Sequence, residues 1–185
     1  MSTAPPQGSP PPLSDVAAAN LERIQQQVRD TMKKAFWDKL EQDAAQKPLT
    51  PETVEWLGQL YGELRQRLAA LTPRRADLHQ ELASALDVEQ LVQVLGAGTV
   101  QTPMLEGMTR YIFGKLLTLC APAQDRGLRC DQEVVLGVLD TQFDVNLGQF
   151  SALLLKRAHA ALDQIEALIR QHREQLATMP GVRPC

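Results

Sequence analysis

Three Thr-Pro dipeptides, each followed by apolar residues at helical spacing, constrain the fold of this chain more than any other feature. They are Thr50-Pro51, Thr72-Pro73 and Thr102-Pro103. A threonine hydroxyl just before a helix accepts a hydrogen bond from an N–H of the first turn, and proline at the first helical position loses no hydrogen bond. The repeated pattern therefore predicts that three helices begin at residues 51, 73 and 103.

Apolar residues recur at steps of three and four along most of the chain, which is the period of an amphipathic helix. The spacing predicts helices over about residues 15–46, 51–71, 73–86, 88–95, 103–120, 131–139 and 144–177. Asp87 and Asp131 are the expected caps of two of them, and Gly96-Ala97-Gly98 is an expected helix end. No segment alternates with period two, so no strand is predicted.

The expected fold class is all-α: a single helical bundle of about six to seven helices with a Pro-rich disordered N-terminal tail. We expect the tail at residues 1–13, the domain at 14–179 and a C-terminal tail at 180–185. The proline-rich tail is interpreted as solubilising rather than as a ligand for a proline-recognition domain. The fifth helix is the most apolar, so it is expected at the centre, with Leu117 buried. Gly58 and Gly62, one turn apart, are expected to admit a close neighbouring helix.

Charge and hydropathy exclude several classes of function. The net charge is −3 over 185 residues, whereas a protein that grips phosphates usually has a basic excess, so no nucleic-acid partner is expected. No apolar run is long enough for an integral membrane segment, and no secretory signal is apparent. Three scattered cysteines, Cys120, Cys130 and Cys185, argue against a disulfide framework and favour a reducing, cytoplasmic location.

No arrangement of residues indicates catalysis, a cofactor or a metal. The three histidines, His79, His159 and His172, lack metal-ligand spacing and are interpreted as solvated or helix-face residues. Acidic residues gather at helix starts, where they complement the helix dipole. The prediction is therefore a non-enzyme, with no catalytic, cofactor-binding or metal-binding residue.

The first helix carries two features of interest. Its apolar residues, from Val16 through Ile24, Val28 and Met32 to Leu40, are expected on one stripe. Its densest basic stretch contains Lys33 and Lys34, interleaved with acidic residues. A solvated face with i,i+4 ion pairs is the default interpretation of these lysines. A docking surface for an acidic partner is the alternative.

Three motifs in order resemble the T-complex protein 11 family. The stretch TMKKAFWD, residues 31–38, is similar to the first conserved helix of that family. LASALDVEQL, residues 82–91, is similar to a second family segment. LTLCAP, residues 117–122, followed by Asp125, is similar to a third. Together they cover roughly residues 20–170, and because chains of this family usually run some hundreds of residues further, this one resembles a short or truncated member.

The resemblance implies an all-helical fold and a non-enzymatic role in signal transduction, with protein partners and a link to cyclic-AMP-dependent signalling. The hypothesis is thus a regulatory adaptor that binds proteins through a helical surface. Its contact residues are placed either at Lys33 and Lys34 on the first helix or at Asp125 in the 120–131 turn. The alternative is a bundle that binds a small apolar ligand or lipid in its core, beside Gly107 and Gly114 of the fifth helix.

Overall fold

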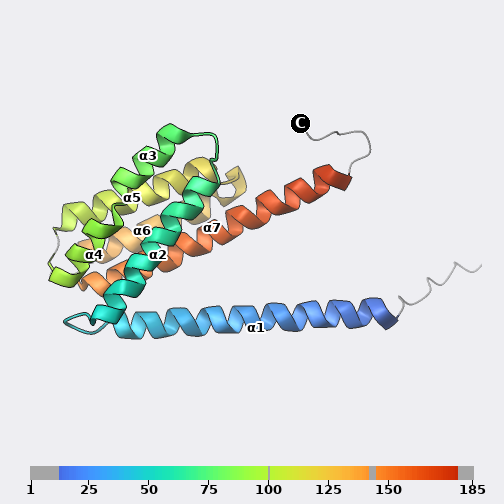
Figure 1. Ribbon diagram of the computed structural model, residues 1–185, viewed down its shortest axis with the longest axis horizontal. Helices are drawn as coiled ribbons and strands as arrows, with labels where there is room; N and C mark the ends of the chain where they lie inside the picture. Colours follow the sequence, from blue (N-terminus) through green and yellow to red (C-terminus); the bar gives the residue numbers. More distant parts are fainter. Residues whose placement is uncertain (1–12, 100, 142–144, 179–185) are drawn as a thin grey trace, which may run out of the picture. The chain divides into compact units, whose positions relative to one another are not determined.

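The computed structural model describes residues 13–99, 101–141 and 145–178, and these residues are almost entirely helical (Figure 1). They form no strand, which confirms the all-α prediction. The elements are α1 (Leu13–Ala44), α2 (Pro51–Ala70), α3 (Ala76–Ala85), α4 (Val88–Ala97), α5 (Thr102–Leu119), the 3-10 turn η1 (Pro122–Gln124), α6 (Asp125–Thr141) and α7 (Leu147–Thr178). The expected tails at 1–13 and 180–185 lie outside the described residues, apart from Leu13.

By their internal contacts the residues divide into two units, 1–39 and 40–185. The described part of the first unit is one long stretch of α1, in which every residue from Val16 to Phe36 is exposed. The second unit contains the last turn of α1 and all the other helices. The bounds 14–179 for one domain stay a prediction.

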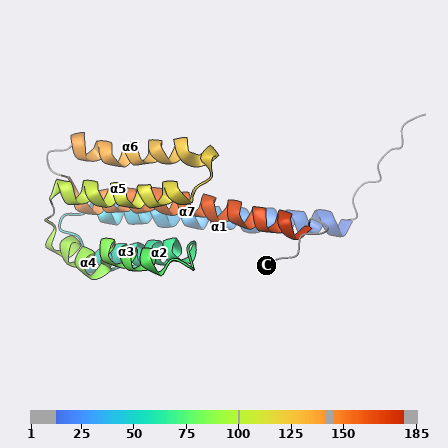
Figure 2. The same ribbon diagram turned by 90° about the horizontal axis from the view of Figure 1, so that it is seen from above.

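The helices of the second unit lie in three layers (Figure 2). α6 forms one outer layer, α5 and α7 lie in the middle, and α2, α3 and α4 form the other outer layer. α7 packs on α2, α5 and α6, and so connects all three layers. The largest fully buried side chains come mainly from the middle layer and α2, among them Tyr61, Leu64, Ile112, Phe113, Phe150 and Leu154.

Several helix ends lie where local capping chemistry predicts them. The Thr50 hydroxyl accepts a hydrogen bond from the N–H of Thr53 at 3.2 Å, at the start of α2. The Asp87 carboxylate accepts from the N–H of Gln90 at 3.1 Å, at the start of α4. α4 ends at Gly98, whose φ of 66° is the left-handed conformation that glycine adopts at least cost.

Three predicted helix starts are wrong. The Thr72 hydroxyl hydrogen-bonds back to carbonyls of α2, so it finishes that helix, and α3 begins only at Ala76. α5 begins at Thr102 itself, with Gln101 as its cap, so Pro103 is its second residue. α6 begins at Asp125, six residues before Asp131, and the Asp131 carboxylate accepts from Arg157 of α7 at 2.6 Å instead.

One prediction of burial, that of Leu117, is also wrong, and the apolar residues of α1 differ in exposure. Those from Val16 to Phe36 are exposed, whereas Trp37 and Leu40 are buried. On α5, Leu116 is fully buried and Leu117 is only partly so. α5 contacts helices on two sides, and a shift of one residue, about 100° of helix, moves Leu117 off both contacts.

A side-chain cap and a glycine fix the start of α7. Asn146 Oδ1 accepts from the N–H groups of Gly148 and Gln149 at 3.0 and 3.2 Å, and its Nδ2 donates to the carbonyl of Ala45 at 3.1 Å. A Cβ at Gly148 would overlap the carbonyl oxygen of Ala44. Glycine at this position therefore lets the start of α7 pack directly on the last turn of α1.

Candidate functional site

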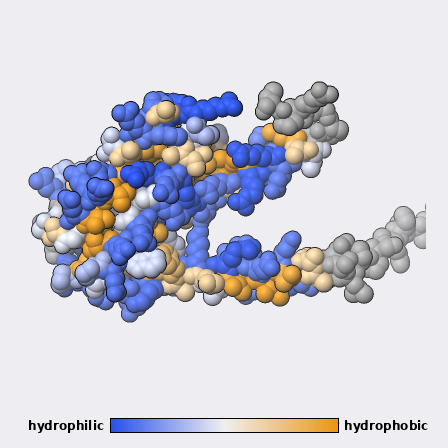
Figure 3. Space-filling view, viewed as in Figure 1, coloured by the Kyte–Doolittle hydropathy of each residue, from blue (hydrophilic) through white to orange (hydrophobic). Residues whose placement is uncertain are grey.

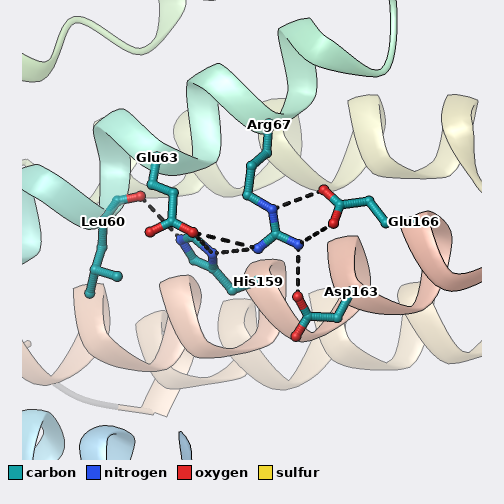
Figure 4. A network of polar contacts seen from close by, with 6 residues as sticks. All are labelled: Leu60, Glu63, Arg67, His159, Asp163 and Glu166. Carbon is teal, nitrogen blue, oxygen red and sulfur yellow. Dashed lines mark hydrogen bonds and ion pairs between the residues drawn. The ribbon is translucent and has the colours of Figure 1, made fainter. Parts of the chain in front are cut away.

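The most connected polar cluster of the second unit joins α2 to α7 around Arg67 (Figure 4). The Arg67 guanidinium donates twice to Glu166, with both N–O distances 2.9 Å, and once to Asp163 at 2.7 Å. Glu63, one turn before Arg67, lies 3.9 Å away. Because the Arg67 side chain is only 19% exposed, this cluster fixes the register of α2 on α7.

His159 completes the cluster from inside. Its Nε2 lies 3.1 Å from the carbonyl of Leu60 and its Nδ1 lies 3.1 Å from Nη1 of Arg67. A carbonyl only accepts and a guanidinium only donates, so the ring carries its proton on Nε2 and accepts at Nδ1. Both nitrogens are engaged and His159 is 4% exposed, which corrects its prediction as a solvated or helix-face residue.

The chemistry of the Arg67 cluster is that of a structural contact, which holds α2 against α7. Its guanidinium fills the position between the carboxylates that a bound cation would need. Among the described residues no group of three or more histidine, cysteine, aspartate and glutamate side chains is arranged to hold a metal ion. His79 is also structural, because its Nε2 lies 3.0 Å from the carbonyl of Ala69 and 2.8 Å from that of Thr72 and so closes the turn between α2 and α3.

The lysines predicted as contact residues lie in the first unit. Lys33 and Lys34 are exposed on α1. Lys34 forms an i,i+4 ion pair with Asp38 at 2.9 Å, and this hydrogen bond raises the pKa of Lys34 above its usual range. The pair fits the solvated-face interpretation and leaves the docking interpretation untested.

Asp125, the third predicted contact residue, lies in the second unit as the first residue of α6. Its carboxylate accepts from Arg129, one turn later, at 2.8 Å. Asp125 follows Gln124, which lines an apolar groove between the end of α5 and the second half of α7. Asp125 therefore stands beside a concave surface, which sequence reasoning did not predict.

This α5–α7 groove has a volume of about 620 Å³. Aliphatic side chains form its floor: Leu119, Ile165, Leu168 and Ile169. Polar and cationic side chains stand around it: Gln124, Gln171, His172 and Arg173. Leu168 is 41% exposed, which is unusual for a leucine surrounded by apolar neighbours, and exposed apolar patches of this kind mark interaction surfaces.

Cys120 also lines the α5–α7 groove, but its thiol is not activated. Burial first, and the nearby Asp125 carboxylate second, raise the pKa of the Cys120 thiol. The reactive form of a cysteine is its thiolate, which a raised pKa depletes. Cys120 therefore contributes surface to the groove and not a nucleophile.

A second groove, between α2 and α4, has a volume of about 970 Å³. Gly58 lets α2 and α4 approach closely, because a Cβ at residue 58 would lie 2.5 Å from Cγ2 of Val92. A Cβ at Gly62 would lie at an ordinary 4.0 Å from Cγ2 of Val88. The helix that was predicted to pack closely on α2 is therefore α4, and its close approach requires glycine at residue 58. The two grooves share no helix.

The fifth helix offers less space for a ligand. Beside Gly107 lies a pocket of about 260 Å³, and Gly114 does not line it. Sites for drug-sized ligands usually measure roughly 300–1,000 Å³. Ile112, Phe113 and Leu116 of α5 are fully buried and fill the centre of the bundle.

No helix of the described residues is both long enough and apolar enough to cross a membrane.

Comparison with known proteins supports the resemblance of the three motifs. The family profile described as T-complex protein 11 matches residues 15–167. The chain is 30% identical to T-complex protein 11 of Mus musculus over 103 residues, which is 55% of this chain and 17% of that protein. It is 29% identical to the T-complex protein 11 homolog of Homo sapiens over 107 residues, 57% of this chain and 20% of that protein.

The matched region thus spans about a fifth of the length of these relatives. No solved structure matches the chain. The profile match covers most of the chain and contains all three motifs, from TMKKAFWD to LTLCAP. The chain therefore belongs to the T-complex protein 11 family.

Proposed function

We propose that this chain is a non-enzymatic regulatory adaptor and that it binds a protein partner in the α5–α7 groove. The observation that carries the proposal is the partly exposed Leu168 within an aliphatic floor, with polar and cationic groups around it. Such a groove suits an amphipathic helix, which presents apolar residues at steps of three and four to the floor. Acidic residues on that helix would meet His172 and Arg173.

The proposal of a non-enzymatic role has support of a different kind. The Arg67 cluster saturates its own hydrogen-bonding groups, and the Cys120 thiol has a raised pKa. Neither offers a group poised for acid–base or nucleophilic chemistry. Family resemblance suggests cyclic-AMP-linked signalling as the process, and a cytoplasmic location fits it.

The experiment begins with a photo-crosslinking amino acid at residue 168 of the full chain, in lysate of the source organism. A matched probe at residue 167, which is exposed, lies about 100° around α7 from residue 168 and does not line the groove, is the control. A protein cross-linked at 168 and absent at 167 is the expected result. If both probes give the same pattern, the groove is not the contact surface.

The partner is then purified and titrated against three variants. Leu168→Glu is expected to weaken binding at least roughly tenfold, since it places a carboxylate on an apolar contact. Ala167→Glu adds the same charge next to residue 168 but outside the groove lining, and it is expected to change nothing. Lys33→Glu/Lys34→Glu tests the basic stretch of α1; if this variant alone abolished binding, the contact would lie at Lys33 and Lys34.

The identity of the partner tests the proposed process separately. A component of a cyclic-AMP pathway is the expected partner. A partner outside that pathway would leave the adaptor proposal standing and remove the link to cyclic AMP.

The ligand-binding alternative would place an apolar molecule against α5 beside Gly107, where the pocket measures about 260 Å³. Native mass spectrometry of the purified protein separates the two proposals. A bound lipid or small molecule that survives gentle ionisation would favour the alternative, whereas a mass equal to that of the bare chain would favour the adaptor.

A further inference from the structure

In the first unit, α1 carries an apolar stripe that is exposed to solvent. On α1, Leu21, Ile24, Val28 and Met32 are 57%, 56%, 51% and 68% exposed. Their spacing of three, four and four residues puts them on one side of the helix. Ile24, Val28 and Met32 line a shallow surface depression there. Figure 3 shows the hydrophobic atoms gathered along this side of α1. A single helix this exposed has only marginal stability in water. Covering the apolar stripe with a binding partner would stabilise it.

The stripe is not an extension of the side of α1 that is buried in the second unit. Leu40 and Ala44 mark that buried side. Seven residues make almost two helical turns, so Lys33 and Gln26 continue the side of Leu40 toward the N-terminus. Both are exposed and polar. The stripe therefore belongs to a separate contact surface.

The stripe is self-complementary when two copies run antiparallel. If the helices cross at residue 26, Ile24 of each copy faces Val28 of the other, and Leu21 lies within one residue of the position opposite Met32. The small residues Ala17 and Ala35 then meet at the two ends, where they let the helices approach closely. A parallel pair would match large with large and small with small equally well, so the direction of the pairing rests on the charges beside the stripe.

The charges beside the stripe carry the same symmetry. Glu22 and Arg29 are seven residues apart, hence on the same side of α1, and they lie at almost equal distances from residue 26. In an antiparallel pair the same sides of the two helices are adjacent, so Glu22 of each copy meets Arg29 of the other, twice. Within one chain Arg29 donates to the neutral Gln26 at 2.8 Å, a bond that it can exchange for a carboxylate.

We infer that two copies of this chain associate through an antiparallel pairing of α1 over residues 17–35. The inference is independent of the adaptor proposal, which concerns the second unit. The occupant of the stripe is a second copy because both the apolar pattern and the Glu22–Arg29 pattern are complementary to themselves.

Sedimentation equilibrium of the full chain over a wide range of concentration measures the association. A monomer–dimer equilibrium is expected. Ile24→Glu/Val28→Glu should leave only monomer, because it puts charges in the centre of the contact. Ala19→Glu adds a charge on the opposite side of α1, away from Arg29, and should dimerise as the original chain does. A chain that stays monomeric throughout, or a dimer that survives Ile24→Glu/Val28→Glu, overturns the inference.

Charge reversal tests the antiparallel geometry without touching the apolar residues. Glu22→Arg alone sets arginine against arginine, and Arg29→Glu alone sets glutamate against glutamate, so each should weaken the dimer roughly tenfold over two exposed pairs. An equimolar mixture of the two variants restores opposite charges at both pairs. Its heterodimer should therefore regain the affinity of the original chain. A mixture no tighter than either variant alone overturns the antiparallel pairing.

An anionic lipid surface is the competing occupant of an amphipathic helix. Flotation with vesicles of phosphatidylcholine and phosphatidylserine tests it on the same variants. Binding by a monomeric chain, lost in Ile24→Glu/Val28→Glu, would overturn the inference in favour of the lipid surface. Absence of vesicle binding by a chain that dimerises supports it.

Discussion

The guanidinium of Arg67 on α2 and the carboxylate of Glu166 on α7 form a two-point contact across 99 residues of sequence, with both N–O distances 2.9 Å. Asp163 and His159, on the two preceding turns of α7, contact the same guanidinium. This contact joins α2, in an outer layer of the second unit, to the central helix α7.

Replacing Arg67 should cost stability, because Arg67→Met leaves Asp163 and Glu166 close together without their shared cation. Removing one partner of a fully buried pair costs roughly 3–5 kcal/mol. Both carboxylates are about one-third exposed, so water compensates in part, and we expect about 2 kcal/mol. Urea unfolding followed by circular dichroism measures it.

The control for Arg67 is Arg110→Met, which removes an exposed i,i+4 pair with Glu106. Exposed pairs of this kind contribute roughly 0.3–0.5 kcal/mol. Equal losses in the two variants would mean that the contact of Arg67 with α7 is no more than a surface ion pair.

Both tyrosines should titrate only at high pH. Burial raises the pKa of Tyr61, and burial together with Glu81 raises the pKa of Tyr111 to about 12. Both values exceed the unfolded value of about 10, so the folded state holds these protons more tightly. The stability they contribute is present below pH 10 and is lost as the pH rises through the folded values.

Tyrosinate absorbance near 295 nm measures this titration. Native protein should show almost no increase at pH 10, while the urea-unfolded chain shows the full transition there. Tyr61→Phe should leave a single transition, that of Tyr111, near pH 12. A tyrosine of the folded protein that titrates at its usual pH would contradict the burial of Tyr61.

Two glycines should respond to alanine in opposite directions. Gly148→Ala is expected to destabilise the protein by about 2 kcal/mol, because its Cβ would meet the Ala44 carbonyl and the backbone cannot give way cheaply. Gly107 lies inside α5 with nothing within 4 Å of a Cβ, so Gly107→Ala should stabilise the helix by up to about 1 kcal/mol. Thermal melting of the two variants shows the sign of each change directly. Loss of stability in both would mean that the space at Gly107 is filled.

A carboxylate at Leu116 should prevent folding of the second unit, whereas one at the neighbouring Leu117 should not. Leu116 is fully buried, so Leu116→Asp would bury an unpaired charge at a cost of several kcal/mol. Leu117 is partly exposed, so Leu117→Asp lets water reach its carboxylate. Helical circular dichroism at 25 °C compares them. If Leu116→Asp folds normally, the face of α5 that carries Leu116 is not the buried one.

The candidate contact residues stay predictions. Lys33, Lys34 and Asp125 were predicted from local basic density and a family motif, and in the structure Lys34 and Asp125 form i,i+4 ion pairs while Lys33 is exposed on α1. The Arg67 cluster was missed. The sequence contained part of the pattern, since Glu63 and Arg67 lie on one side of α2, and Asp163 and Glu166 lie on one side of α7. Local sequence does not indicate that these two helix sides face each other.

The sequence by itself determined the helical class, the number of helices and several of their ends. These depend on contacts within a few residues: Thr50 and Asp87 cap the N–H groups of the next turn, and Gly98 supplies a left-handed end. Hydrophobic spacing has the same short range, so it reports an amphipathic helix wherever the helix lies.

Only the tertiary structure decided which apolar faces are covered. Leu116 rather than Leu117 is buried, Thr72 ends α2 instead of starting α3, and α1 divides into a buried end at Leu40 and an exposed stripe at Ile24. An apolar side chain gains the same free energy from any neighbour that excludes water, so its identity does not name the neighbour. The choice is made by packing between helices far apart in sequence, and that packing also brought Arg67 to Glu166.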